Sequence, residues 1–287
     1  MSLSIVSIVV GAVVATSLVV TLAFCVDHGA PRELIQRLDD VAIDLAPYFV
    51  LVGGVMLVHR LTHGASVKIS KSLHWNITDS IFGIEGAFVA QLQAITPKAL
   101  VPVFSGFYMF GFTYVVATPV VLYLLVSSIR PLKELLVAYS LNNAIGALLY
   151  TLFIAYGPRI RLDGRIDGLL YEWFPQTQQL TSAVSANTNV FPSLHTSLSV
   201  VVLLFAWRQR HSQPRWFGIA SVVTPGIVMS TMVLGIHWLT DVVAGIVLAY
   251  GSVVAAGRIV PVVDTWWSGV VGEPTTGARA SSDPADD

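Results

Sequence analysis

Seven long apolar runs dominate this sequence, and they restrict the folds open to it more than any other feature. A helix needs about 20 mainly apolar residues to cross the hydrocarbon core of a bilayer. Most of the runs approach or reach that length. We therefore predict an all-α fold, a polytopic transmembrane helical bundle of about six or seven spans. The runs cover residues 3–26, 41–61, 100–127, 135–156, 191–207, 217–236 and 239–260.

Composition supports a membrane protein and argues against a nucleic-acid partner. Hydrophobic residues make up 54% of the chain and charged residues only 11%. Soluble domains carry roughly a quarter charged residues, so this chain has too few to coat a surface that faces water. The formal net charge is -1, which gives no general attraction to nucleic acid. We expect the bilayer to be the environment of the protein.

The stretch between the second and third runs is different in character. Residues 62–96 are too polar to span a membrane. Within them, residues 76–95 alternate apolar side chains with polar ones such as Asp79, Glu85 and Gln93. That pattern is typical of a helix that lies flat in the membrane interface. We therefore predict one interfacial helix between the second and third spans.

The same features divide the chain into three parts. Residues 1–61 form the N-terminal spans, and residues 76–260 form a membrane core. Residues 272–287 contain mostly Gly, Ser, Thr, Pro and Asp, which cannot build a core, so we predict a disordered tail.

Orientation follows from the basic residues of one short turn. Three arginines lie within eight residues, at Arg208, Arg210 and Arg215. Because short cytoplasmic loops are enriched in Lys and Arg, this turn is predicted to face the cytoplasm. The long loop of residues 157–189 and the turn near His237 would then lie on the extracytoplasmic side.

Two segments place histidines at the ends of predicted spans. Residues 189–197 read NVFPSLHTS and contain His195, while residues 230–241 read STMVLGIHWLTD and contain His237. Ionisable groups in or beside spans are costly and usually functional. The two segments therefore hold the candidate site residues.

The second segment has the spacing of an activated nucleophile. His237 and Asp241 are four residues apart, so on one helix they share a face. A carboxylate there can bind one imidazole nitrogen and leave the other free to attack. Ser230 lies seven residues before His237 and would share that face if the helix continued without a break.

The first segment combines a helix start with a second imidazole. Pro192 and Ser193 stand where a helix should begin, and free N–H groups at a helix start bind phosphate. Ser193 adds a hydroxyl donor. His195 follows in the first turn, where it could protonate a leaving alkoxide. One hairpin separates the two spans, so their outer ends can meet.

These segments resemble two signature motifs of the type 2 phosphatidic acid phosphatase superfamily. The usual Pro-Ser-Gly-His carries Leu194 in place of glycine, and the usual Ser-Arg carries Thr231 in place of arginine. Both departures resemble the inositol phosphorylceramide synthase branch. Softer likenesses are the TDSIFG of residues 78–83, Asn143 with Gly146, and Pro158-Arg159.

The resemblance implies a mechanism that needs no metal ion and no cofactor. His237 attacks phosphorus and becomes a phosphohistidine, and Asp241 orients it. His195 protonates the leaving group and then activates the acceptor. With water as acceptor the enzyme is a lipid phosphatase; with a polyol or lipid alcohol it is a phosphotransferase.

The cation that holds the phosphate is less obvious. A further motif of the superfamily is a lysine followed, after six residues, by Arg-Pro. This motif is missing here, because Tyr123 occupies the lysine position before Arg130-Pro131. Arg159 is our candidate, since it opens the loop on the catalytic side; Arg161 and Lys98 are alternatives. The expected phosphate contacts are therefore Ser193, Arg159, Ser230 and Asn143.

Two other functional classes remain open from the sequence. His195 and His237 could be the axial ligands of a haem, but that leaves Asp241 and the Pro192-Ser193 pair unexplained. A non-catalytic lipid transporter or scramblase is the other class, and its activity would survive His237→Ala.

Overall fold

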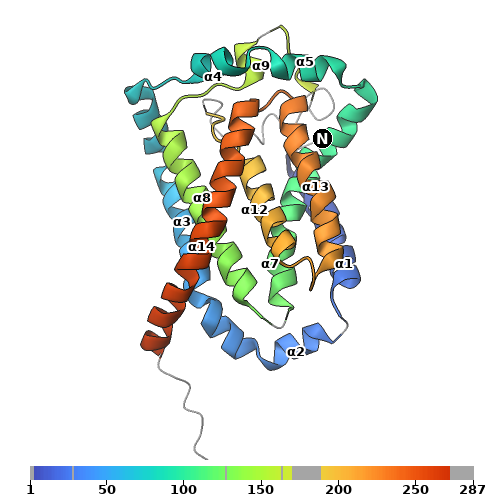
Figure 1. Ribbon diagram of the computed structural model, residues 1–287, viewed down its shortest axis with the longest axis vertical. Coiled ribbons are helices and arrows are strands. Elements are labelled where there is room, and N and C mark those ends of the chain that lie inside the picture. Colours follow the sequence, from blue (N-terminus) through green and yellow to red (C-terminus); the bar gives the residue numbers. More distant parts are fainter. Residues whose placement is uncertain (1–2, 28, 127, 163, 170–188, 272–287) are drawn as a thin grey trace, which may run out of the picture.

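The prediction of an all-α membrane bundle is confirmed by the computed structural model. The structure describes residues 3–27, 29–126, 128–162, 164–169 and 189–271, and within these ranges the regular elements are all helices. Two isolated β-bridges, Asn76 with Ile154 and Ala155 with Asn189, are the only ladder pairings there. Figure 1 shows the long helices standing side by side.

Within the described ranges, seven helical segments run through the bundle. Six of them are long and apolar enough to cross a membrane, by their length and composition among the described residues. The exception is α12, which has 15 residues. In chain order the seven are α1 (Leu3–Cys25), α3 (Leu38–Leu73), the segment Lys98–Leu124 that ends in α7 (Phe112–Leu124), α8 (Arg130–Leu152), α12 (Leu194–Arg208), α13 (Pro214–Val233) and α14 (Leu239–Val271).

Short helices cover the two ends of the bundle. At one end α2 (Ala30–Gln36) joins α1 to α3, with Pro31 in its first turn. At the other end α4 (Thr78–Glu85), α5 (Phe88–Ile95) and α9 (Pro158–Arg161) lie across the long helices (Figure 1). We call the end that carries α2 the α2 end, and the end that carries α4, α5 and α9 the capped end.

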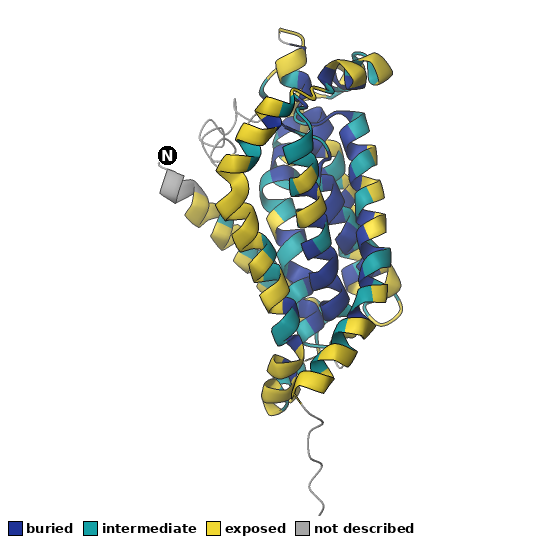
Figure 2. Ribbon diagram, turned by 90° about the vertical axis from the view of Figure 1, so that its left-hand side faces the viewer, coloured by how far each residue is buried: buried dark blue, intermediate teal, exposed yellow. Residues whose placement is uncertain are grey.

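The core surrounds the short helix α12. It packs against α8, α13, α14 and α7, and its Val201, Val202 and Phe205 are at most 1% exposed. Figure 2 shows the buried residues in the middle of the bundle and exposed ones along the outer helices. Because α12 is enclosed by protein, its limited length does not have to match the bilayer.

The second span is longer than predicted. We expected it to end at residue 61, before a stretch too polar to span, but α3 continues to Leu73. Hydroxyl side chains in this extension form hydrogen bonds: Thr62 Oγ1 donates to the Val58 carbonyl at 2.7 Å and Ser70 Oγ to the Phe153 carbonyl at 3.1 Å. Ser66 and Thr151 hydroxyls also pair at 2.5 Å, so α8 supports the extension.

The single interfacial helix expected over residues 76–95 is instead two helices. The chain turns at Gly86, whose φ of 57° lies in a region that L side chains rarely adopt. On either side of this break, α4 and α5 bury Ile81 and Val89 in one apolar cluster.

Other boundaries also differ from the prediction, and the spans expected to end at residues 127, 156 and 236 end at Leu124, Leu152 and Val233. The third span contains a π-helical turn, Phe107–Gly111, before α7. Helix α8 begins at Arg130, five residues before the expected start, because Pro131 fits a first helical turn. Helix α14 runs to Val271 and not to residue 260.

The long C-terminal part of α14 is anchored by charge at the α2 end. Lys133 Nζ lies 2.8 Å from Asp264 Oδ1 and 3.5 Å from Asp44 Oδ2. The Tyr48 hydroxyl also donates to Asp264 at 2.7 Å. This cluster joins α3, α8 and α14.

Candidate active site

His237 and Asp241 form a buried pair at the capped end. His237 lies in the turn between α13 and α14, and Asp241 lies in the first turn of α14. Asp241 Oδ2 is 3.4 Å from His237 Nδ1 and accepts a bond from the Trp238 backbone N–H at 2.8 Å. The two residues are 5% and 0% exposed. One carboxylate oxygen therefore orients the ring and shapes the turn.

The helix does not continue from Ser230 to His237. It ends at Val233, and Gly235 takes a φ of 68°. The His237 backbone N–H then donates back to the Thr231 carbonyl at 3.0 Å. The condition for Ser230 to share a helical face with His237 is therefore not met, and its buried hydroxyl donates to the Ile227 carbonyl at 2.6 Å.

His195 approaches His237 from the first turn of α12. The two ring centroids are 6.3 Å apart with an interplanar angle of 53°. Tyr108 stacks on His195 with a distance of 4.5 Å between the ring centroids, and the centroid of the Phe112 ring lies 4.2 Å from that of His195. Separate helices thus bring both imidazoles together, and two aromatic rings from the third span hold one of them in place.

Ser193 is the N-cap of α12 and is fully buried. Its Oγ accepts the Thr196 backbone N–H at 3.3 Å, and its own N–H donates to the Asp241 carbonyl at 3.1 Å. Because a hydroxyl can accept and donate at once, the Ser193 proton can still serve a ligand. The bond to Asp241 links the two histidine segments directly.

Glycines allow the chains of the site to approach closely. A Cβ on Gly245 would lie 2.7 Å from the Ser193 carbonyl oxygen. One on Gly146 would lie 2.6 Å from the side chain of Leu194, the residue that replaces the family's glycine. Residue 146 is therefore small where residue 194 is large.

Arg159 is brought to the rim of the site through its backbone. Its N–H donates to the Gly235 carbonyl at 3.3 Å, two residues before His237, and the residue is half-buried. Arg161 points to α4 instead, where Nε lies 2.9 Å from Asp79 and the guanidinium lies over the Phe82 ring. Lys98 is exposed at the start of its helical segment.

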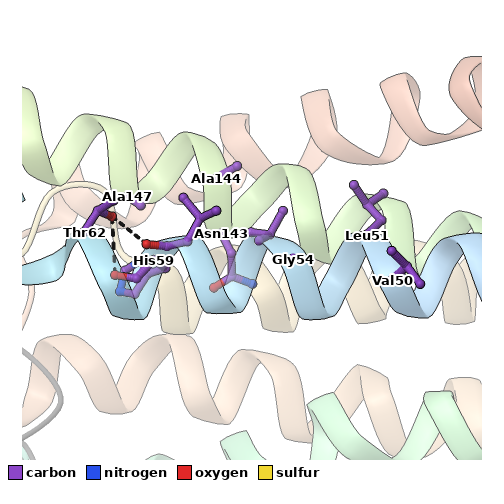
Figure 3. Close-up of a pocket in the computed structure, with 10 residues that line it drawn as sticks. Val50, Leu51, Gly54, His59, Thr62, Asn143, Ala144 and Ala147 are labelled. Carbon is purple, nitrogen blue, oxygen red and sulfur yellow. Dashed lines mark hydrogen bonds between the residues drawn. The ribbon is translucent and has the colours of Figure 1, made fainter.

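Asn143 is not brought to the histidines. Its amide donates to the Tyr139 carbonyl at 2.9 Å, and its side chain lines a cavity of about 450 Å³ between α3 and α8. Figure 3 shows it among the α3 residues Gly54 and His59. The neighbouring Asn142 faces the interior instead and donates to the Ser197 hydroxyl.

Sequence reasoning missed four residues that support the site. Tyr108 and Phe112 contact His195, and their only signal was an aromatic-rich span. Glu85 accepts bonds from the start of α14, and Gln93 donates to the Val233 carbonyl at 3.0 Å. Both stood out as polar residues in the interfacial stretch, but nothing in the sequence identified their partners.

Comparison with known proteins places these residues in a family. The family model described as the PAP2 superfamily matches residues 80–255, which include both histidines and Asp241. An uncharacterized protein of Methanocaldococcus jannaschii is 22% identical over 165 residues, or 57% of this chain. The match spans 63% of that protein's own length, less than two thirds. No solved structure matches the chain.

Proposed function

Because this chain belongs to the PAP2 superfamily and has six long apolar helices, we propose that it is a membrane-embedded lipid phosphatase or phosphotransferase. Membership supports phosphatase-type chemistry on lipid-related substrates. The observation that carries the proposal is the meeting of His195 and His237, from separate helices, beside a buried Asp241.

The proposed reaction has two steps that use the same groups. His237 Nε2 attacks phosphorus, because Nδ1 is turned toward the Asp241 carboxylate. The phosphorus–oxygen bond to the leaving alcohol breaks, and His195 supplies the proton that this oxygen needs. His195 then removes a proton from the acceptor, whose oxygen takes the phosphoryl group from the phosphohistidine. Such acid–base assistance contributes roughly 10²–10⁴-fold to the rate.

The proposed substrate is a lipid that carries a phosphate in its head group. The site lies where the long helices meet the short helices of the capped end (Figure 1), so a lipid could keep its chains in the bilayer while its phosphate reaches the histidines. The Ser193 hydroxyl and the Arg159 guanidinium would bind the phosphate oxygens. The Leu194 and Gly146 pair, together with Thr231, supports the inositol phosphorylceramide synthase-like branch, with a polyol or a lipid alcohol as acceptor.

The capped end is proposed to face away from the cytoplasm. The turn with Arg208, Arg210 and Arg215 lies where α12 ends and α13 begins, at the α2 end (Figure 1). By the positive-inside rule that end is cytoplasmic.

A panel of lipid phosphates and diphosphates tests this function, with and without myo-inositol. Wild-type protein, His237→Ala, His195→Ala and the control His63→Ala would be assayed for free phosphate and for new lipid. His63 is exposed on α3 and has no role in the mechanism. We expect both site variants to lose turnover and His63→Ala to keep it. A labelled phosphohistidine should form in wild type and be absent in His237→Ala.

The same panel separates the other functional classes. Lipid movement between leaflets that survives His237→Ala, without turnover in wild type, would indicate a transporter or scramblase. A haem absorbance band in the purified protein that is lost in both histidine variants would indicate a haem protein.

A further inference from the structure

We propose that Glu85 of α4 is a positioning residue, which fixes the first turn of α14 and so aligns Asp241 with His237. The inference rests on the proposed function, since it assigns Glu85 a role in the same phosphoryl transfer. Glu85 reaches this turn from a helix that follows α3 in the chain and precedes α14 by more than 150 residues.

The hydrogen bonds of Glu85 lie at the start of α14. Its Oε1 accepts the Leu239 backbone N–H at 3.1 Å, and Oε2 accepts the Thr240 N–H at 2.8 Å. Oε2 also accepts the Thr240 hydroxyl at 2.9 Å. Both carboxylate oxygens are therefore used, and all three donors belong to the first two residues of α14.

These donors are the groups that a helix start leaves unpaired. The first N–H groups of a helix have no partner within it, and a carboxylate there also interacts favourably with the helix dipole. Asp241 satisfies the Trp238 N–H just before the helix. Two carboxylates, one internal and one from α4, thus hold the start of α14 from both sides.

The clamped turn is the part of the chain on which the catalytic pair depends. Asp241 Oδ2 contacts both His237 Nδ1 and the Trp238 N–H. A shift of residues 238–240 therefore moves the carboxylate relative to the imidazole. Loss of Glu85 leaves two backbone donors unsatisfied, and we expect the turn to fray or rotate.

Helix α4 is itself held firmly enough to act as the support. The Ile77 N–H donates to the Ile154 carbonyl at 2.9 Å, and Thr78 Oγ1 accepts the Tyr156 N–H at 2.9 Å. Tyr156 in turn accepts the Trp238 indole N–H at 2.8 Å. The segment around residue 155 thus ties α4 to the residue next to His237.

The test compares Glu85→Ala and Glu85→Gln with Glu33→Gln, a matched control. Glu33 is an exposed glutamate of α2 at the other end of the bundle. Full-length protein in detergent or vesicles is assayed on the lipid phosphate that wild type turns over best. The rate is normalised to folded protein, and amide hydrogen exchange is followed in the peptide that covers residues 238–242.

We expect Glu85→Ala to lower kcat about 10- to 100-fold and to change KM less than about threefold. The size is taken from metal sites, where removal of a group that orients a ligand costs about 10- to 100-fold. Glu85→Gln keeps one carbonyl acceptor and should fall between Ala and wild type. Exchange at residues 238–242 should quicken in both variants and stay unchanged in Glu33→Gln. If Glu85→Ala does not fold, Glu85→Gln carries the comparison alone.

Folded Glu85 variants with wild-type kcat would overturn the inference, as would a rise in KM alone, which indicates substrate contact. Unchanged exchange at residues 238–242 would also overturn it. Wild-type protein that turns over no lipid phosphate would instead refute the proposed function, and the exchange measurement would still decide whether Glu85 clamps α14.

Discussion

Replacement of Gly245 by alanine tests how closely the two histidine segments must approach. Gly245 is one turn after Asp241 on α14 and faces the start of α12. An added Cβ would lie 2.7 Å from the Ser193 carbonyl oxygen, 3.3 Å from Thr196 Cβ and 3.4 Å from the Ser197 nitrogen. Two of these three atoms are backbone, so no side-chain rotation relieves the contact.

The size of the expected effect follows from that distance. Ordinary contact begins at 3.4 Å, so α12 and α14 must separate by about 0.7 Å at this point. Overpacking of this kind costs typically about 1–3 kcal/mol of stability. The bond from Ser193 N–H to the Asp241 carbonyl, now 3.1 Å, lies within one turn of the contact and would lengthen. Since a misplacement of about 1 Å can cost roughly 10²-fold in rate, we expect kcat to fall about 10- to 100-fold.

Gly251 provides a matched control on the same helix. A Cβ there meets nothing within 4 Å, so Gly251→Ala should raise stability by about 0.5–1 kcal/mol through helix propensity. Thermal unfolding and lipid phosphate turnover would be measured for both variants. A Gly245→Ala protein with wild-type kcat and unfolding midpoint would refute the argument that contact between α12 and α14 aligns the site.

Two further predictions address other parts of the molecule. Lys133→Met should lower the free energy of unfolding by about 1–2 kcal/mol, because the substitution removes a largely buried ammonium and leaves two half-exposed carboxylates without it. Its kcat should stay unchanged, because the cluster lies at the α2 end. An unchanged unfolding midpoint would contradict this prediction. Arg159→Met should lower kcat/KM about 10- to 100-fold if its guanidinium binds the phosphate. Arg161→Met loses an exposed pair with Asp79 and a contact with the Phe82 ring, so it should lower kcat/KM less. Equal losses in the two variants would count against Arg159.

The helices could be predicted from the sequence because apolar runs in a membrane have few alternatives. The predicted end of the second span failed because polar side chains beyond it have partners near or on α8. The hydrogen bond between the Ser66 and Thr151 hydroxyls is an example. No local sequence pattern shows that α3 continues beside α8 and forms this bond. The break at Gly86 was equally hidden, because the stretch also contains Gly83, which lies inside α4, and the sequence does not reveal which glycine has a positive φ.

Part of the site could be anticipated in the same way. The spacing of His237 and Asp241 and the position of Ser193 before His195 are local properties, and the resemblance to a known family supplied the link between them. Glu85 and Tyr108 reach the site only through packing between distant segments. Asn143 shows the limit of local reasoning, because its neighbour Asn142 occupies the inward face of α8.

The shortness of α12 has a consequence for how the protein is made. Its 15 residues span about 22 Å at 1.5 Å per residue, against a hydrocarbon core of about 30 Å. Alone in lipid, such a helix would leave backbone groups unsatisfied at its ends. It therefore has to enter the bilayer in company with the longer helices around it. Substitutions that weaken its surroundings should reduce the yield of inserted protein before they produce an inserted protein that is inactive.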